Sequence, residues 1–479
     1  MGEPGWPRAT EDRTGLRHRW LRRLLPAALL TCAIALYNRF PLTYPDAGNY
    51  LENALAIAHG KAPWFFYRPL MYGSLLIPFA TPQTIWLIPL AQGLLVAFVV
   101  DLTLRTAVVP LSDRGFVAVF AGLSACTSLP WISGQIMPDV LTGVTILLCF
   151  VSAWGDERLT VRERWTVGAL LTIAIGSHLS HLPLYGILAV ATLFWRVLVD
   201  RASRRRRRFL PLALGAMAPL VVAAGLAIGS NYYFHRAAVL SRSSALFALG
   251  HLVGDSLAQP YLDRICATQR YLLCAERASL RPNLDWFLWH PDGTWKRHEP
   301  EVQRGDSTFL REAPAIVAGT LRQEWPAAIR ASLHTAIVQL RTFGTDAGDF
   351  AYSKTVAKAL ARLGPRTLRA YDDSRQVQHS LPLGAARRLQ YAVVGASVLV
   401  LLGCLQSLRG GAFAPMRALI GTVFLGVVLN ALVIGAFAMV QPRDQSRVVW
   451  LVPLMGAIAA LQVVRGRAGR SSDAAERSR

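Results

Sequence analysis

Long apolar stretches separated by short polar segments dominate this chain. Ten of them are each about 15 to 25 residues long, close to the roughly 20 residues that an α-helix needs to cross a bilayer. They cover residues 21–40, 84–108, 115–131, 138–154, 165–179, 181–199, 209–230, 389–405, 416–440 and 448–464. The pattern predicts an all-α, polytopic membrane protein with about ten transmembrane helices. The fifth and sixth stretches adjoin, so one long bent helix is the alternative there.

The composition supports a membrane protein. Hydrophobic residues make up 53% of the chain and charged residues only 17%, and the mean hydropathy is +0.33. A net charge of +22 would suggest nucleic acid as the partner of a soluble protein. Here the arginines cluster between the apolar stretches and no nucleic-acid-binding motif is recognisable, so we expect membrane lipids and no nucleic acid as partners.

The distribution of arginine predicts the orientation. With the N-terminus in the cytoplasm, every short inner segment is basic, as the positive-inside rule requires. These segments contain Arg17, Arg19, Arg22, Arg23, Arg114, Arg158, Arg162, Arg164, Arg201, the block 204–208, Arg409, Arg465, Arg467 and Arg470. A signal peptide is the alternative for the first stretch, but no small-residue cleavage site is recognisable near residues 37–42. Because arginine far outnumbers lysine, we expect a GC-rich bacterial genome and location in the inner (plasma) membrane.

The same topology divides the chain into four regions. Residues 1–230 form an N-terminal transmembrane module whose first outer loop, 41–83, carries juxtamembrane helices. Residues 231–388 form a partly helical outer (periplasmic) segment, too long for a simple connection. Residues 389–465 form C-terminal transmembrane helices, and 466–479 a disordered cytoplasmic tail. Within the outer segment, apolar residues at helical spacing from Ile316 to Leu340 predict amphipathic helices bent near Pro326, which we interpret as a packing face rather than a substrate groove.

Only two of the six cysteines, Cys266 and Cys274, lie outside the apolar stretches. In an oxidising compartment their spacing is compatible with a disulfide, although the sequence leaves open whether the sulfurs meet. The other four are expected to act as small core hydrophobes. No cysteine pattern typical of metal ligands is present, and we expect neither a metal nor a cofactor.

Two acids are expected at the outer face. Asp46 lies just past the first apolar stretch, and Asp139 begins the fourth. An acid near hydrocarbon is costly unless it has a partner or a chemical role. The alternative is structural: Asp46 would cap a helix that starts at Ala47, and Asp139 would follow Pro138 at an ordinary helix start. The topology places both acids on one side of the membrane, which favours a shared site.

Cations and aromatic side chains are expected on the same side. The guanidinium groups of Arg68, Arg443 and Arg447 offer planar donor forks suited to phosphate; interfacial anchoring or local ion pairing is the alternative. His178 and His181 lie in one turn, where a hydrogen-bonded interfacial role is favoured over contact with a headgroup. Tyr50 and the aromatic residues 64–66 are typical of an interfacial belt, the alternative to stacking on a sugar.

Three short segments resemble a known superfamily. Residues 44–50 read Tyr-Pro-Asp-Ala-Gly-Asn-Tyr, residues 67–72 read Tyr-Arg-Pro-Leu-Met-Tyr, and Pro138 precedes Asp139. Together they resemble the glycosyltransferase C (GT-C) superfamily, nearest the family 39-like protein O-mannosyltransferases and lipid A aminoarabinose transferases. The resemblance covers about the first 200 residues. The chain departs from it in having one acid at position 46, with Glu52 nearby, and one proline after Arg68.

The resemblance implies inverting transfer of a sugar from a polyprenyl-phosphate donor to a lipid, glycan or protein acceptor at the outer face. Asp46 would be the general base and Asp139 would hold the acceptor or an arginine. The charge of the departing lipid phosphate would be offset by arginine. The substrate-binding residues would be Arg68, Tyr50, Glu52, His178, His181, Arg443 and Arg447. Enzymes of this type resemble metal-independent transferases.

Two other classes of protein remain as alternatives. A transporter or flippase of a lipid-linked saccharide should have internal repeats and polar breaks near mid-membrane, whereas no clear repeat is recognisable and the notable charges gather at one surface. A noncatalytic scaffold would keep its role after mutation of Asp46. The position of the polar residues favours the glycosyltransferase.

Overall fold

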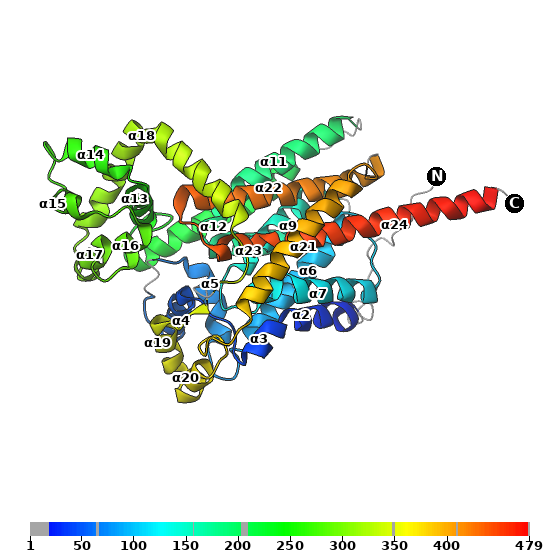
Figure 1. Cartoon of the computed structure of the whole chain (residues 1–479), viewed down its shortest axis with the longest axis horizontal. Helices are drawn as coiled ribbons and strands as arrows, with labels where there is room; N and C mark the ends of the chain where they lie inside the picture. The colour runs from blue at the N-terminus through cyan, green and yellow to red at the C-terminus, as the bar shows by residue number, and fades with distance from the viewer. Residues whose placement is uncertain are drawn as a thin grey trace.

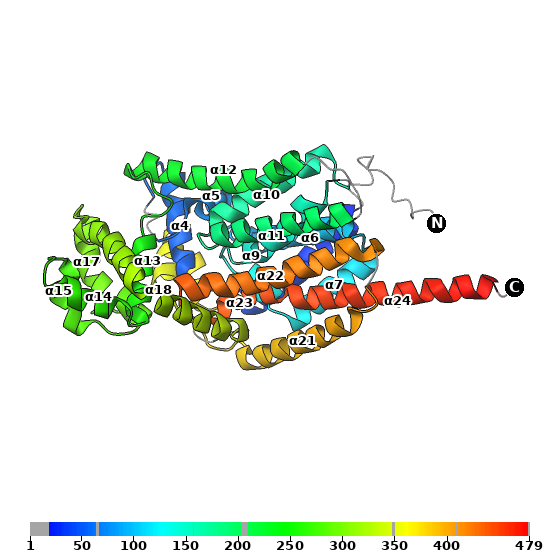
Figure 2. The ribbon, with the colours of Figure 1, turned by 90° about the horizontal axis from the view of Figure 1, so that it is seen from above.

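The computed structural model describes residues 19–63, 67–156, 158–202, 209–346, 350–408 and 411–477. Within these ranges the secondary structure is helical, and the only β-type pairing is an isolated bridge between Leu42 and Gln135. The prediction of an all-α protein is confirmed. A smaller domain of short helices lies at one end of a bundle of long helices, and α24 extends from the bundle in the opposite direction (Figures 1 and 2).

The N-terminal half of the bundle contains thirteen elements within the described residues. They are η1 (Trp20–Leu24), α2 (Leu25–Thr31), α3 (Ala33–Asn38), α4 (Pro45–Ala58), α5 (Leu70–Leu76), η2 (Ile77–Phe79), α6 (Leu87–Thr106), α7 (Asp113–Cys126), α8 (Leu129–Ser133), α9 (Val140–Trp154), α10 (Val161–Ser177), α11 (His181–Ala202) and α12 (Phe209–His235). The remaining elements belong to the small domain and to the C-terminal half. They are α13 (Ser244–Gly254), α14 (Ala258–Ile265), α15 (Leu272–Glu276), η3 (Arg277–Ser279), α16 (Leu284–Trp289), α17 (Thr294–Gln303), α18 (Thr308–Arg341), α19 (Lys354–Leu363), α20 (Pro365–Asp372), α21 (Leu383–Cys404), η5 (Gly411–Phe413), α22 (Ala414–Phe437), α23 (Pro442–Val449) and α24 (Leu451–Arg477).

Six helices in the described part of the chain are long and apolar enough to cross a membrane. They are α6, α11, α12, α21, α22 and the continuous helix Pro442–Arg465 formed by α23 and the start of α24. These helices indicate an integral membrane protein. The predicted count of ten is not confirmed, because the other four apolar stretches form short or broken helices. The first breaks at Cys32, and α7, α9 and α10 have 14, 15 and 17 residues.

The central helix of the bundle is α9. Fourteen of its fifteen residues are buried, and it packs against α6, α10, α11 and α22. A helix that is apolar on all sides is buried either in a protein core or in a membrane, so hydropathy alone does not distinguish α9 from a lipid-facing span. At about 1.5 Å per residue its 15 residues extend only about 22 Å, less than the roughly 30 Å of hydrocarbon.

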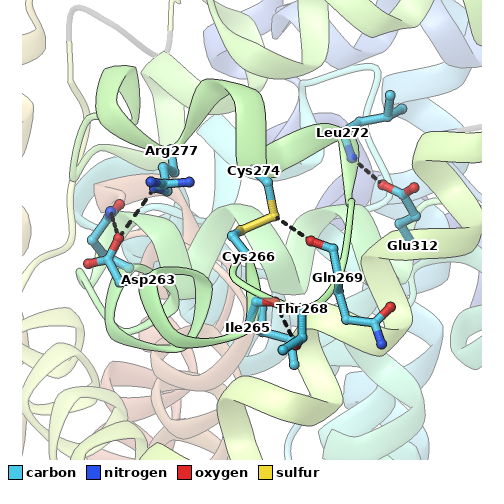
Figure 3. Close-up of a disulfide and its surroundings, with 10 residues drawn as sticks. Asp263, Ile265, Cys266, Thr268, Gln269, Leu272, Cys274, Arg277 and Glu312 are labelled. Carbon is cyan, nitrogen blue, oxygen red and sulfur yellow. Dashed lines mark hydrogen bonds and ion pairs between the residues drawn. A yellow bond between two sulfur atoms is a disulfide. The ribbon is translucent and has the colours of Figure 1, made fainter.

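The small domain, which we call the outer domain after the position that the sequence predicts for it, comprises α13 to α17 and the first part of α18. It has its own hydrophobic core, which includes Leu246, Phe287 and Trp295. A disulfide joins Cys266 to Cys274 across a Cα–Cα distance of 5.6 Å. Figure 3 shows the bridged loop beside α18, where the backbone N–H of Leu272 donates to the Glu312 carboxylate at 2.8 Å.

Helix α18 leaves the outer domain and returns to the bundle. Its backbone is non-helical at Glu324, two residues before Pro326, so the predicted bend is confirmed. The second half crosses α22 closely at Gly435, where a Cβ would lie 2.4 Å from the Ser332 carbonyl oxygen. The predicted apolar stripe is not buried along its length: Ile316 lies in the outer-domain core, whereas the members from Leu321 onward are exposed.

Residues 350–376 pack against the first loop rather than in the outer-domain core. Helix α19 lies along α4, and a Cβ on Gly48 would be 2.5 Å from the backbone carbon of Thr355. Gln376 adds two hydrogen bonds to the backbone of Thr43. The predicted outer segment 231–388 therefore contains two parts, of which the second covers the helix that carries Asp46.

Candidate functional site

Asp46 lies in the first turn of α4. The helix begins at Pro45, whose fixed φ suits the first helical position, and its N-cap is Tyr44. The structural alternative, in which Asp46 caps a helix starting at Ala47, is therefore wrong. Its carboxylate instead forms an ion pair with Arg68, in which Nη2 lies 2.6 Å from Oδ1.

Arg68 approaches Asp46 from the segment just before α5. Its Nη1 also donates to the backbone carbonyl of Tyr67 at 3.2 Å. Contacts at both terminal nitrogens therefore fix the orientation of the guanidinium group. Burial opposes the charged form, but Asp46 raises the pKa of Arg68 above its ordinary value. The Arg68 fork is thus charged and held beside the acid.

Asp139 is the N-cap residue of α9, yet its side chain accepts no capping hydrogen bond. It is 1% exposed, and neither carboxylate oxygen has a hydrogen-bond partner among the described residues. The nearest cations are Arg447, with Nη1 at 3.6 Å, and Arg443, with Nη1 at 4.0 Å. An ordinary helix start does not require a buried carboxylate that has ionic neighbours but no hydrogen-bond partner.

Helix α23 supplies both of those arginines. Their i, i+4 spacing places Arg443 and Arg447 on one face, and Asp444 lies 3.8 Å from the first and 3.5 Å from the second. Arg443 also lies 3.8 Å from Asp46 and stacks over the ring of Tyr44 at 3.6 Å.

Arg447 is fully buried and oriented by an amide from the spanning helix α22. Its Nε and Nη2 donate to the Asn430 side-chain oxygen at 3.1 and 2.9 Å. The Asn430 nitrogen donates in turn to the Asp444 carbonyl at 2.7 Å and to the Gln445 side chain at 2.9 Å. Because both ends of the amide have partners, Asn430 holds Arg447 in one orientation with Nη1 toward Asp139.

These contacts define an ion cluster of three acids and three arginines: Asp46, Asp139, Asp444, Arg68, Arg443 and Arg447. The structure brings together five of the six acidic and arginine side chains that the sequence assigned to the site, and the sixth, Glu52, pairs with Arg362 instead. The sequence did not identify Asp444 or Asn430 as site residues. An amide in the middle of an apolar stretch was the available signal for Asn430, since polar groups inside a membrane need partners.

The two histidines border the cluster. His178 Nδ1 lies 2.7 Å from the Ser180 hydroxyl, which accepts from Arg447 Nη2 at 3.3 Å. Burial, followed by the positive charge of Arg447, holds the pKa of His178 well below its ordinary value. His181 donates from Nδ1 to the Ala174 carbonyl at 2.7 Å, and its Nε2 lies 2.8 Å from the Thr142 hydroxyl. His178 is therefore a neutral neighbour of the cluster, and His181 is a hydrogen-bonded core side chain.

Tyr50 and Glu52 lie in different surroundings, although both are on α4. Tyr50 is one turn after Asp46 and fully buried; its ring meets that of Tyr72 edge to face at 5.0 Å. The interpretation of Tyr50 as part of an interfacial belt is therefore wrong, and residues 64–66 lie outside the described residues. Glu52 forms an ion pair with Arg362 of α19, and no contact joins it to the ion cluster in the described part of the chain.

A cavity of about 180 Å³ adjoins the cluster. It lies between α5, α10 and α12 and is lined mainly by apolar side chains, among them Leu70, Met71 and Leu226. Arg68 forms part of its wall, with Arg242 elsewhere in the lining. An apolar cavity with guanidinium groups in its wall suits an amphiphile with an anionic head.

The described residues contain no group of three or more His, Cys, Asp or Glu side chains arranged to hold a metal ion. The carboxylates of the ion cluster face guanidinium groups instead. No protein-family model, curated protein or solved structure matches this chain.

Proposed function

We propose that this protein is a membrane glycosyltransferase that moves a sugar from a polyprenyl-phosphate donor to a lipid, glycan or protein acceptor. The observation that carries the proposal is the position of Arg68. Its guanidinium pairs with Asp46 at 2.6 Å and also lines the apolar cavity. A phosphate head at Arg68 with its prenyl chain along that cavity would place the sugar beside Asp46.

The pairing between Arg68 and Asp46 makes the basicity of Asp46 depend on whether the donor is bound. A carboxylate in an ion pair is a weak base, because the arginine stabilises its charged form. A lipid phosphate competes for the same planar donor fork. When the phosphate takes Arg68, Asp46 loses its closest positive neighbour and becomes a better proton acceptor, so the base becomes active when the donor is bound.

The reaction follows from these positions. Asp46 accepts the proton of an acceptor hydroxyl as its oxygen attacks the anomeric carbon. The bond between that carbon and the phosphate oxygen breaks, and its electron pair leaves with the lipid phosphate. Arg68 and Arg443 offset the developing charge, while Asp139 holds Arg443 and Arg447 in place. Attack opposite the leaving group inverts the anomeric configuration.

The remaining features of the proposal come from the charge distribution of the sequence. The positive-inside pattern supports a site at the outer face of a bacterial inner membrane, open to the periplasm. Tyr50, next to the acid, and His178, next to Arg447, would shape the sugar and phosphate sites. Glu52 has no supporting contact with the ion cluster and serves below as a control.

The test is transfer by purified protein in nanodiscs, with radiolabelled polyprenyl-phosphate sugars and crude envelope acceptors. Removing a general base costs about 10²- to 10⁴-fold, so Asp46→Asn should lose at least about 100-fold in rate while remaining monodisperse. Glu52→Gln, a change to a carboxylate on the same helix, should stay within about twofold.

Equal transfer by Asp46→Asn and the wild type would refute the assignment of the base. Movement of intact donor between leaflets without any transfer would favour a flippase instead. Because Glu52→Gln removes an acid that pairs with Arg362, it also controls for a general loss of negative charge on α4.

A further inference from the structure

Tyr67 joins the outer domain to the ion cluster. It precedes Arg68 in the chain, and its side chain packs against the outer-domain core. Its partners Trp295 and Glu299 in the outer domain lie 228 and 232 positions further along the chain. Tyr67 is therefore a physical link between two distant parts of the chain.

The side chain of Tyr67 is held by three outer-domain residues. Its hydroxyl donates to the Glu299 carboxylate and accepts from the Trp295 indole N–H at 2.9 Å. Its ring meets Trp289 at 5.4 Å between centroids. Trp295 is fully buried, and Glu299 also pairs with Lys296 at 2.7 Å, so the hydroxyl enters an already ordered network.

The backbone of the same residue holds Arg68. The Tyr67 carbonyl accepts from Arg68 Nη1 at 3.2 Å, while Nη2 pairs with Asp46 at 2.6 Å. Burial, followed by the hydrogen bond to Glu299, raises the pKa of Tyr67, so the hydroxyl keeps the proton that it donates. One residue thus fixes its side chain in the outer domain and its carbonyl at the arginine fork.

We propose that Tyr67 is a positioning residue through which the α16–α17 region of the outer domain sets the Arg68 guanidinium for an anionic lipid head. The identity of that head as a polyprenyl phosphate rests on the proposed function. The outer domain thereby acts on the donor site without touching the donor. An Arg68 guanidinium that is already oriented loses less freedom when it binds phosphate, so its orientation by Tyr67 increases the affinity for the lipid head.

Loss of the Tyr67 hydroxyl should weaken binding of the lipid head. Tyr67→Phe removes the hydroxyl and leaves Glu299 and Trp295 without that partner. We expect binding of the phosphate head to weaken about tenfold, which corresponds to about 1.4 kcal/mol and lies within the range for an unsatisfied buried hydrogen-bonding group. Asp46 keeps its place in the first turn of α4, so the rate at saturating donor should change less than the KM for the donor.

Two measurements test the proposal. The first is binding of sugar-free polyprenyl phosphate to the full chain in nanodiscs. The second is the rate at which an arginine-selective dicarbonyl modifies Arg68, followed by peptide mass spectrometry, which needs no ligand. We expect about tenfold weaker binding and severalfold faster modification in Tyr67→Phe. Tyr261→Phe, which removes a hydroxyl from the same outer-domain core, should behave as wild type in both.

Variants of Glu299 separate positioning from a general loss of structure. Glu299→Gln keeps an oxygen that accepts from Tyr67 and should bind nearly as the wild type, whereas Glu299→Leu should reproduce Tyr67→Phe. Unchanged modification of Arg68 in Tyr67→Phe would overturn the positioning role. If Arg68→Gln and the wild type bind the lipid equally, the proposed donor site fails instead, and the modification rates still decide the role of Tyr67.

Discussion

Removal of the Asp139 charge is predicted to destabilise the folded protein through Arg447. Arg447 is fully buried, and its Nη1 lies 3.6 Å from Asp139 and 3.5 Å from Asp444. At an effective dielectric constant of about 20, a charge pair at this distance interacts by about 4–5 kcal/mol. Breaking a buried pair from one side costs about 3–5 kcal/mol. Because Asp444 still balances Arg447, we expect Asp139→Asn to lose about 3 kcal/mol of unfolding free energy.

A double-mutant cycle measures the interaction directly. Asp139→Asn, Arg447→Gln and the double variant would be compared by denaturant unfolding in mixed micelles, with tryptophan fluorescence as the signal. Each single change removes one side of the Asp139–Arg447 pair, whereas the double change removes both sides. The double variant should therefore lose about 2–3 kcal/mol less than the sum of the single losses.

Additivity would refute this reasoning. If the loss in the double variant equals the sum of the two single losses within about 0.5 kcal/mol, Asp139 and Arg447 do not interact in the folded state. Glu52→Gln is a useful reference, because its partner Arg362 is on the exposed side of α19. Loss of such an exposed pair should cost no more than about 1 kcal/mol.

Three further predictions concern the outer domain, the helix crossing and pH. Gly435→Ala should lower the thermal midpoint in detergent by an amount equivalent to about 1–3 kcal/mol, since its Cβ would meet backbone atoms of α18; Gly395→Ala, in open space, is the control. Cys266→Ser should make the outer domain more sensitive to limited proteolysis, because a loop with a sequence separation of 8 contributes about 2–3 kcal/mol. Burial and Arg447 lower the pKa of His178, so the unfolded chain takes up the proton first as the pH falls. Stability should therefore decline below about pH 6.5, and less steeply in His178→Gln; equal slopes in unfolding titrations would contradict this.

The sequence predicted much of the ion cluster because topology carries positional information. The predicted spans alternate in direction and so place the ends of distant apolar stretches on one side. Asp46, Asp139, Arg443 and Arg447 lie at or near such ends, and Arg68 lies in the loop between the first two stretches. Because the acids and the arginines carry opposite charges, a shared site was the simplest interpretation. Their meeting in the structure follows from those positions.

Other features depend on contacts that no local pattern encodes. Tyr67 and Glu299 are 232 residues apart, and Glu52 and Arg362 are 310 apart, so neither pair could be found from spacing. The number of spans was uncertain because hydropathy reports apolar character and not the medium around a helix. Helix α9 is as apolar as any span, yet protein surrounds it. The disulfide was left open because the turn that joins α14 to α15 decides whether the sulfurs meet.

The packing of α19 on α4 has a consequence for the order in which the protein is made. The backbone of Thr355 covers Gly48, and its hydroxyl donates to the Pro45 carbonyl at 2.9 Å across 310 positions of chain. At about 5–20 residues per second, synthesis needs about 15–60 s between these two points. Arg443 and Arg447 emerge later still. Nascent chains therefore carry Asp46 into the membrane well before its cover and two of its arginine neighbours exist, and the ion cluster closes only when nearly the whole polypeptide has been inserted.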